Sequence, residues 1–179
     1  MGKLKQLLPY RGRTLIQHAI HHALQAGFDP VVVVVGAESA AVRSSIAAQK
    51  SVVVENPYWQ RGMGSSISAG VRWLQGEGAE SAAIAILLAD QPLVMADRLK
   101  EMRDRLHRGS ADAIAAEYSG TLGVPALFKR SLFGRLSELP PGAGARHLLR
   151  QPGLTVEPFP LPEAALDIDT PTDYDSLIA

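Results

Sequence analysis

The sequence predicts an α/β fold built on a doubly wound, mostly parallel sheet, and three observations support that prediction. Continuous apolar runs, PVVVVVG at 30–36 and AAIAILLA at 82–89, are typical of strands that a parallel sheet buries on both faces. Segments with the apolar spacing of amphipathic helices separate these runs. With 179 residues, 46% of them apolar, the chain is long enough for one domain over 1–179 with a sizeable core.

The elements expected along the chain alternate between helices and strands. The first helix spans 14–26, where the apolar residues form one stripe, Thr14 can cap the start and Gly27 can end the helix. Further helices are expected over 37–49, 65–75 and 95–109. Strands are expected over 30–36, 51–56, 82–90, 112–118, 122–128 and 154–159, with a last strand and helix within 165–179.

Charge and cysteine content exclude several classes of function. Lys and Arg together number 18, as do Asp and Glu, so no long-range field favours nucleic acid or an anionic membrane, and neither is an expected partner. The chain has no cysteine, which excludes thiol catalysis, disulfides and thiolate metal sites and favours a reducing, cytoplasmic location. The apolar runs are too short to span a bilayer, and the start shows no signal-peptide pattern.

Asp90 directly follows the apolar run at 82–89 and precedes Gln91 and Pro92. Ligands of parallel sheets gather at the carboxyl ends of the strands, so a carboxylate at this place could hold Mg²⁺ against a substrate phosphate. The alternative is that Asp90 only starts a turn before the proline. From the residues alone, both interpretations stand.

A glycine- and serine-rich loop, RGMGSS at 61–66, leads from the expected strand at 51–56 into the next helix. Free backbone N–H groups at such a helix start bind phosphate, which makes Gly64, Ser65 and Ser66 candidate phosphate-binding residues. The alternative is ordinary capping by serine, with the glycines serving only the turn.

The segment LDIDTP at 166–171 carries Asp167 and Asp169, two residues apart on an expected strand and therefore on one side of it. Two such carboxylates repel each other unless a cation or a basic group lies between them. The alternative is that Asp169 or Thr170 caps the following helix while Asp167 is solvated.

Two groups of basic residues give weaker indications of a binding site. Lys3 and Lys5 would ordinarily be solvated unless an anion site lies beside them. His18 and His22 have a metal-binding spacing on the helix at 14–26, but they lie off its expected apolar stripe and no carboxylate completes a ligand set.

Taken together, these segments resemble the MobA-like nucleotidyltransferases, and most closely their molybdenum cofactor cytidylyltransferase branch. Several short motifs in the order of the family are more specific than any one of them. The resemblance implies a Rossmann-like fold of the nucleotide-diphospho-sugar transferase type. The matching motifs are KLKQLLPYRGRTLIQHAI, VVVVGA, ENPYWQRGMGSSISAGV, LLADQPLV, GVPALFKRSLF, GARHLL and DIDTPTDY.

In such enzymes a nucleoside triphosphate gives its nucleotidyl group to a phosphate on an acceptor, and pyrophosphate leaves. The resemblance implies CMP transfer from CTP, or transfer from another NTP, to molybdopterin. It implies that Mg²⁺ is held by Asp90, with Asp167 and Asp169 as candidates for completing the metal site. Contact with proteins that mature molybdoenzymes is a further implied interaction.

The resemblance also assigns residues to the nucleotide. Lys5 resembles the lysine that meets the triphosphate, so Lys5 and Asp90 are the candidate catalytic residues. Lys5, Gly64, Ser65 and Ser66 are the candidate nucleotide-binding residues.

The family normally begins with a strand and a glycine-rich LAAGxSxRMG loop, whereas this sequence starts at the final Met1-Gly2. The resemblance therefore predicts an N-terminally truncated fold with a gap in the middle of the sheet, where Lys3 and Lys5 are the remainder of an anion site. A second departure is Pro141-Gly142, where the family commonly has Gly-Asp. Two alternative functions are nucleotidyl transfer to a sugar or alditol phosphate, and nucleotide binding with weak catalysis.

Overall fold

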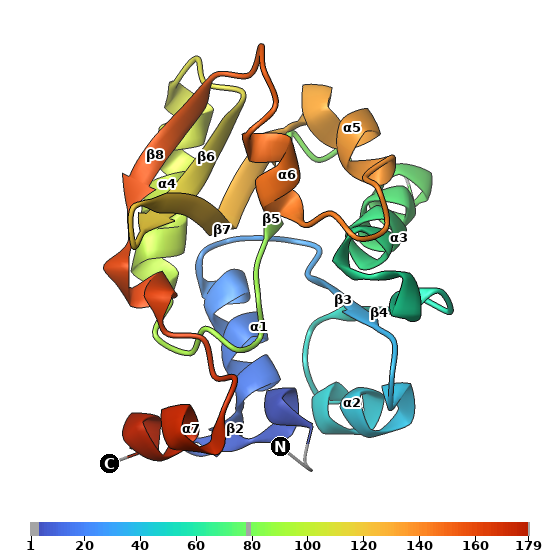
Figure 1. Ribbon diagram of the computed structural model, residues 1–179. Coiled ribbons are helices and arrows are strands. Elements are labelled where there is room, and N and C mark those ends of the chain that lie inside the picture. Colours follow the sequence, from blue (N-terminus) through green and yellow to red (C-terminus); the bar gives the residue numbers. More distant parts are fainter. Residues whose placement is uncertain (1–3, 78–79, 179) are drawn as a thin grey trace.

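The computed structural model describes residues 4–77 and 80–178. Its strands form two main sheets and a short hairpin, with helices packed against the sheets (Figure 1). The helices are α1 (Leu15–Gln25), α2 (Ser39–Ile46), α3 (Met63–Gly76), α4 (Ala96–Arg108), α5 (Phe133–Ser137), α6 (Ala145–Leu149) and α7 (Pro171–Ile178). The strands are β1 (Pro9–Tyr10), β2 (Arg13–Thr14), β3 (Val32–Val35), β4 (Val52–Glu55), β5 (Ala83–Ile86), β6 (Ala113–Tyr118), β7 (Thr121–Lys129) and β8 (Val156–Pro160). Short 3-10 helices are η1 (Lys5–Leu7), η2 (Trp59–Arg61), η3 (Arg130–Leu132) and η4 (Pro162–Ala165). Within the described ranges, none of the helices has the length and apolar character needed to cross a membrane.

The larger sheet contains four strands in the order β5-β7-β6-β8. Strand β7 runs antiparallel to both β5 and β6, while β6 and β8 are parallel. The antiparallel pairing arises because the chain turns back directly from β6 into β7 through Ser119 and Gly120, both at positive φ, as a tight hairpin turn requires. The sheet is therefore mixed.

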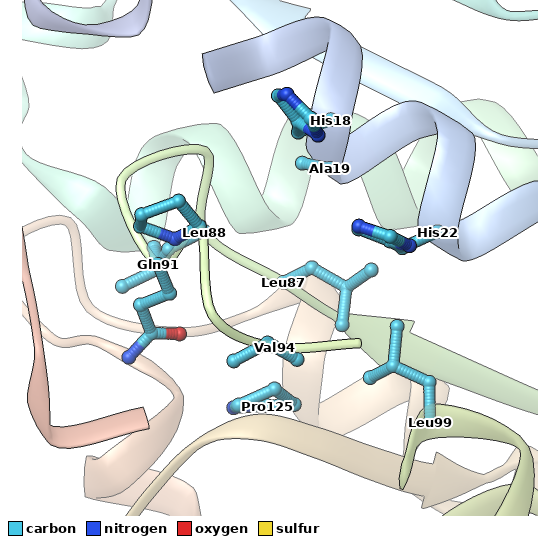
Figure 2. A pocket seen from close by; sticks show the side chains of 10 residues that line it. His18, Ala19, His22, Leu87, Leu88, Gln91, Val94, Leu99 and Pro125 are labelled. Carbon is cyan, nitrogen blue, oxygen red and sulfur yellow. The ribbon is translucent and has the colours of Figure 1, made fainter. Parts of the chain in front are cut away.

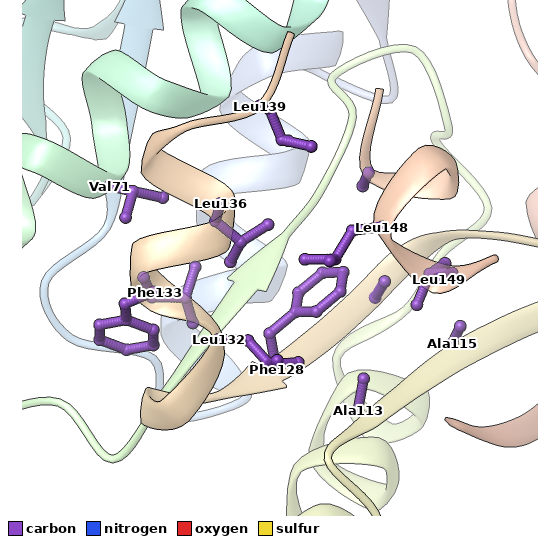
Figure 3. Packing of buried hydrophobic residues seen from close by; sticks show 13 residues of the cluster. Val71, Ala113, Ala115, Phe128, Leu132, Phe133, Leu136, Leu139, Leu148 and Leu149 are labelled. Carbon is purple, nitrogen blue, oxygen red and sulfur yellow. The ribbon is translucent and has the colours of Figure 1, made fainter. Parts of the chain in front are cut away.

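Both faces of the larger sheet are covered. Figure 3 shows one face, where Phe128 of β7 packs with Leu136 of α5 and Leu148 of α6, all three fully buried. On the other face, α4 packs its apolar stripe, including Leu99 and Met102, against the sheet. Full burial of one such side chain contributes roughly 1.5–3 kcal/mol, so this sheet is the main source of hydrophobic stability.

The smaller sheet pairs β3 with β4 in parallel, with Val32 opposite Val52. Ile16 and Ile20 of α1 and Val42 of α2 belong to the apolar cluster that includes this sheet. The sequence predicted that 30–36 would be buried on both faces, and this is wrong for 32–34, which are only half-buried.

A cleft of about 1420 Å³ separates β3 from β5. Within the described residues, β3 pairs only with β4 and β5 only with β7, so the facing edges of β3 and β5 are unpaired. Apolar side chains of both strands, of α1 and of α3 line the cleft. The predicted gap in the sheet is thus confirmed, and it explains why β3 is half-buried.

The carboxyl-terminal segment packs against the first described residues. Ile168 and Leu15 are fully buried in one cluster with Leu8 and Tyr10. The sequence predicted a strand within 165–179 before the last helix, and this is wrong, because 166–169 form no strand. In place of a strand ladder, one backbone hydrogen bond runs from Ile168 of this segment to Asp90, and Ile168 packs in the apolar cluster.

The other expected helices and strands are confirmed, with boundaries that differ by a few residues. Helix α1 begins as predicted, because Thr14 and Gln17 form a reciprocal capping box, and Gly27 follows it at positive φ. Helices α5 and α6 were not predicted, since five residues are too few to show a helical period.

Candidate functional site

Asp90 lies in the loop after β5, which ends at Ile86 rather than continuing to 90 as the sequence predicted. The backbone oxygen of Asp90 accepts a hydrogen bond of 3.0 Å from the backbone N–H of Ile168. Because Ile168 stands between Asp167 and Asp169, this bond holds the two carboxyl-terminal aspartates beside Asp90. The structure therefore places the Asp90 loop next to the segment that carries Asp167 and Asp169.

Lys5 lies between two of these carboxylates. Its Nζ is 2.6 Å from Oδ2 of Asp90 and 2.8 Å from Oδ1 of Asp169. Burial alone would lower the pKa of Lys5, but its hydrogen bonds with Asp169 and Asp90 outweigh that effect, and the pKa is raised. Lys5 is thus held in its charged form and offsets the repulsion between the carboxylates.

Asp167 experiences the reverse balance. Burial raises the pKa of Asp167, and the negative charge of Asp90 raises it further, while Gln91 and Lys5 act in the opposite direction. Oδ1 of Asp167 and Oδ1 of Asp90 are both buried, and neither has a hydrogen-bond partner among the described residues. Two carboxylate oxygens are therefore available to a further cation or donor.

The carboxylates do not form a closed metal cage. Across 4–77 and 80–178, no three His, Cys, Asp or Glu side chains stand close enough to hold a metal ion by themselves. The side chain of Asp90 is only 15% exposed, whereas that of Asp169 is 68% exposed. A cation at this place would need ligands from a bound substrate as well as from the protein.

Gln91 is a buried residue of the site region that the sequence analysis did not assign (Figure 2). Its Nε2 donates to the backbone oxygen of Ala164 at 2.8 Å and to that of Val124 at 3.3 Å. These bonds fix the Asp90 loop to the segment that carries Asp167. The only sequence signal was a glutamine between an aspartate and a proline after an apolar run.

The histidines of α1 face the same loop. His18 and His22 are buried, so the expectation that they lie off the apolar stripe is wrong. They line a small cavity with Gln91 (Figure 2), and the ring of His18 is 2.7 Å from the backbone oxygen of Tyr10. No carboxylate reaches them among the described contacts, and they act as packing residues.

The first turn of α3 contains the predicted phosphate-binding residues. The N–H of Gly64 donates to the backbone oxygen of Pro141 at 2.9 Å, so in this conformation it is not free for a ligand. A side chain at Gly64 would overlap the backbone oxygen of Pro140, which explains the glycine. Ser65 Oγ donates to the backbone oxygen of Gly62 at 2.8 Å, whereas a capping serine would accept from a backbone N–H, so Ser65 does not cap the helix.

Ser66 and Asp167 line the same cleft, together with Met63 and Arg146. The start of α3 and Asp167 thus lie at one continuous space at the carboxyl ends of the parallel strands, where ligands of α/β sheets bind. Lys3, which the sequence analysis placed beside Lys5 in an anion site, lies outside the described residues.

A mixed α/β fold in which a lysine pairs with carboxylates near a large cleft fits a nucleotidyltransferase, and comparisons with known proteins show that class. Residues 1–156 match the model of the MobA-like NTP transferase domain. The chain therefore belongs to the MobA-like NTP transferase family.

The chain is also similar to three known proteins from different bacteria. Purine catabolism protein PucB of Bacillus subtilis is 30% identical, over 98% of this chain and 88% of that protein. Molybdenum cofactor cytidylyltransferase of Escherichia coli is 26% identical, over 97% of this chain and 86% of that protein. Rv0371c of Mycobacterium tuberculosis, whose structure was also solved with manganese, is 28% identical with a TM-score of 0.83, over 99% of this chain and 90% of that chain.

Proposed function

We propose that this nucleotidyltransferase transfers CMP from CTP to the phosphate of molybdopterin, with release of pyrophosphate. The observation that carries the proposal is the pairing of Lys5 with Asp90 and Asp169 beside two buried carboxylate oxygens without partners. The similarity to molybdenum cofactor cytidylyltransferase supports the choice of acceptor and nucleotide.

The carboxylates fit a divalent cation. Hard cations such as Mg²⁺ prefer one or two carboxylates plus phosphate oxygens, and Oδ1 of both Asp90 and Asp167 is without a partner. The manganese in the solved relative supports the same choice of ligand chemistry. Asp90, Asp167 and Asp169 would hold Mg²⁺, which would neutralise charge on the transferring phosphate.

The protein's own part in this reaction is to bind and align. An oxygen of the acceptor phosphate attacks the α-phosphorus of CTP, and the bond to pyrophosphate breaks, so no protein nucleophile is required. Lys5 offers three N–H donors to the triphosphate once its carboxylate partners have another counter-charge. The first turn of α3, with Gly64, Ser65 and Ser66, would hold the nucleotide at the opposite wall of the cleft.

Pyrophosphate release tests the proposal. We expect the fastest release with CTP, Mg²⁺ and molybdopterin, and slower release with GTP or with a sugar or alditol phosphate as acceptor. Asp90→Asn should lower turnover about 100-fold or more, because it removes a charged ligand worth several kcal/mol to the transition state. Asp175→Asn, at an exposed position on α7, is the matched control and should keep turnover.

Two results would overturn this proposal. Equal turnover of a sugar phosphate and molybdopterin would remove the assigned acceptor. Normal turnover by Asp90→Asn would remove the assigned site.

A further inference from the structure

Asn56 is the most buried polar side chain bordering the β4–α3 loop, with only 2% of its surface exposed. It directly follows β4, and its backbone N–H donates to Val35 of β3 at 2.8 Å, which fixes it at the carboxyl end of the smaller sheet. A buried amide must satisfy both its donor and its acceptor atoms, so its contacts show which neighbouring groups donate and which accept hydrogen bonds.

The orientation of this amide is fixed by one contact. Oδ1 of Asn56 accepts a hydrogen bond of 2.9 Å from the backbone N–H of Tyr58, which can only donate. Nδ2 must therefore face the other way, and its two hydrogens go to Ser65 Oγ at 2.9 Å and Ser66 Oγ at 3.1 Å. Asn56 is a donor to both serines.

Ser65 and Ser66 differ in whether their hydroxyl hydrogen already has an acceptor in the protein. Each hydroxyl has one hydrogen to donate, and Ser65 gives its hydrogen to the backbone oxygen of Gly62. Ser66 already accepts from Asn56, and no acceptor for its hydrogen is found among the residues that the structure describes. Ser66 also lines the cleft, on the same space as Asp167. Its O–H is left to be donated to a bound molecule.

We propose that Asn56 is a positioning residue that makes the Ser66 hydroxyl a hydrogen-bond donor toward an oxygen acceptor of the bound nucleotide. The acceptor is a phosphate oxygen or a carbonyl oxygen of the base, which present the same chemistry to a hydroxyl. This inference rests on the proposed function and deepens it. It assigns one side-chain donor in the nucleotide site and the residue that directs the hydrogen of that donor toward the ligand.

Asn56→Asp changes the hydrogen-bond donor of residue 56 into an acceptor while keeping nearly the same side-chain shape. A carboxylate has nearly the size of the amide and can still accept from the Tyr58 N–H, but its second oxygen accepts instead of donating. The hydrogen of Ser66 would then turn back to residue 56, and the ligand would lose its donor. Ser66→Ala removes the same donor directly, whereas Ser66→Thr keeps a hydroxyl.

The test is a titration of the full chain with CTP and Mg²⁺, followed by amide NMR shifts so that weak binding can be measured. We expect Ser66→Ala and Asn56→Asp each to weaken binding about tenfold, the cost of one hydrogen bond to a charged or polar acceptor. The double variant should be no weaker than either single variant, because both remove one interaction. Ser66→Thr should stay within about threefold of the unchanged chain, a small fraction of the cost of a lost hydrogen bond.

Ser68→Ala is the matched control. Ser68 lies on the same helix as Ser66, but its hydroxyl already donates to the backbone oxygen of Ser137. Parallel titrations with pyrophosphate and with cytidine identify the acceptor. A loss with pyrophosphate in Ser66→Ala assigns a phosphate oxygen, and a loss only with cytidine assigns the base.

Failure of the inference is distinguishable from failure of the proposed function. If the unchanged chain bound no CTP, the proposed function and this inference would fall together. If the unchanged chain bound CTP and Ser66→Ala bound it equally well, only the inference would be overturned, whether or not Asn56→Asp folds. Multiplied losses in the double variant would also overturn it, because Asn56 would then act independently of Ser66.

Discussion

The two main sheets are built from similar apolar strands, yet they are buried to different extents. Residues 113–116 of β6 are completely buried, because β7 and β8 pair with both edges and helices cover both faces. Residues 32–34 of β3 are half-buried, because one edge borders the cleft. The larger sheet therefore supplies stability, while the smaller sheet forms a wall of the space that holds the candidate site. An apolar run predicts a strand but not how completely its neighbours cover it.

The comparison predicts unequal costs for truncating a side chain in each sheet. Phe128→Ala in the larger sheet should lower the free energy of unfolding by about 3–5 kcal/mol, because it leaves a cavity in a close-packed core. Val33→Ala in the smaller sheet should cost about 1 kcal/mol, because less of that side chain is removed from water. Urea titrations of both variants measure the difference. Equal losses in the free energy of unfolding would show that the two sheets contribute equally to stability.

The open edges predict that an added strand will strengthen nucleotide binding. A chain extended by a strand and a glycine-rich loop of the family pattern should pair with β3 and β5 and bind CTP at least about tenfold more tightly. The physical reason is that the loop adds backbone donors and an arginine to the triphosphate, each a charge-assisted hydrogen bond. Calorimetric titration of both forms with CTP and Mg²⁺ measures this, and equal, tight binding by both would show that the cleft needs no strand.

Lys5 and Lys50 allow a comparison of two ion pairs, one at the site and one remote from it. Lys50 pairs with Asp29 at 2.8 Å on the exposed surface. Lys5→Met should lower turnover about tenfold or more, through loss of a cation at the triphosphate, while its effect on stability stays below about 1 kcal/mol. Lys50→Met should change neither. Equal turnover of the two variants would contradict the role assigned to Lys5.

The smallest effect is expected from pH. Burial lowers the pKa of His22 below its ordinary value of 6.5, and the neighbouring His21, His18 and Arg13 lower it further. As pH falls below 6.5, the unfolded chain takes up a proton that the folded chain resists, so stability is lost from there down to the lowered pKa. His22→Gln should flatten this decline in thermal unfolding between about pH 7 and 5. A decline unaltered by His22→Gln would refute the assignment.

Much of the fold was predictable because its elements are locally encoded. The capping box of Thr14 and Gln17 and the apolar runs of β3 and β6 are readable as patterns over neighbouring residues. The strand expected near 166 was wrong because alternation alone does not supply a pairing partner. The burial of His18 and His22 was missed because it depends on the Asp90 loop, which packs on α1 from a distant part of the chain.

The sequence predicted which residue types form the candidate site but not which of these residues contact one another. Asp90, Asp167 and Asp169 were chosen as carboxylates at expected strand ends, and the structure brings them together through the Ile168 backbone bond. That Lys5 lies between Asp90 and Asp169 could not be known, since these contacts join three segments that are far apart in the sequence. The residues that position the site were missed, because buried amides such as Asn56 and Gln91 show no pattern in sequence.

We propose that Asp90 holds a divalent cation near the cleft, and Mn²⁺ binding measured by electron paramagnetic resonance shows whether it does. Free Mn²⁺ gives a sharp signal that weakens when the ion is bound, so its loss can be titrated with the full chain and CTP. We predict that the unchanged chain and Asp175→Asn reduce the free signal equally, beyond CTP alone, and that Asp90→Asn gives no reduction beyond CTP alone. A reduction by Asp90→Asn equal to that of the unchanged chain would show that Asp90 does not hold the cation.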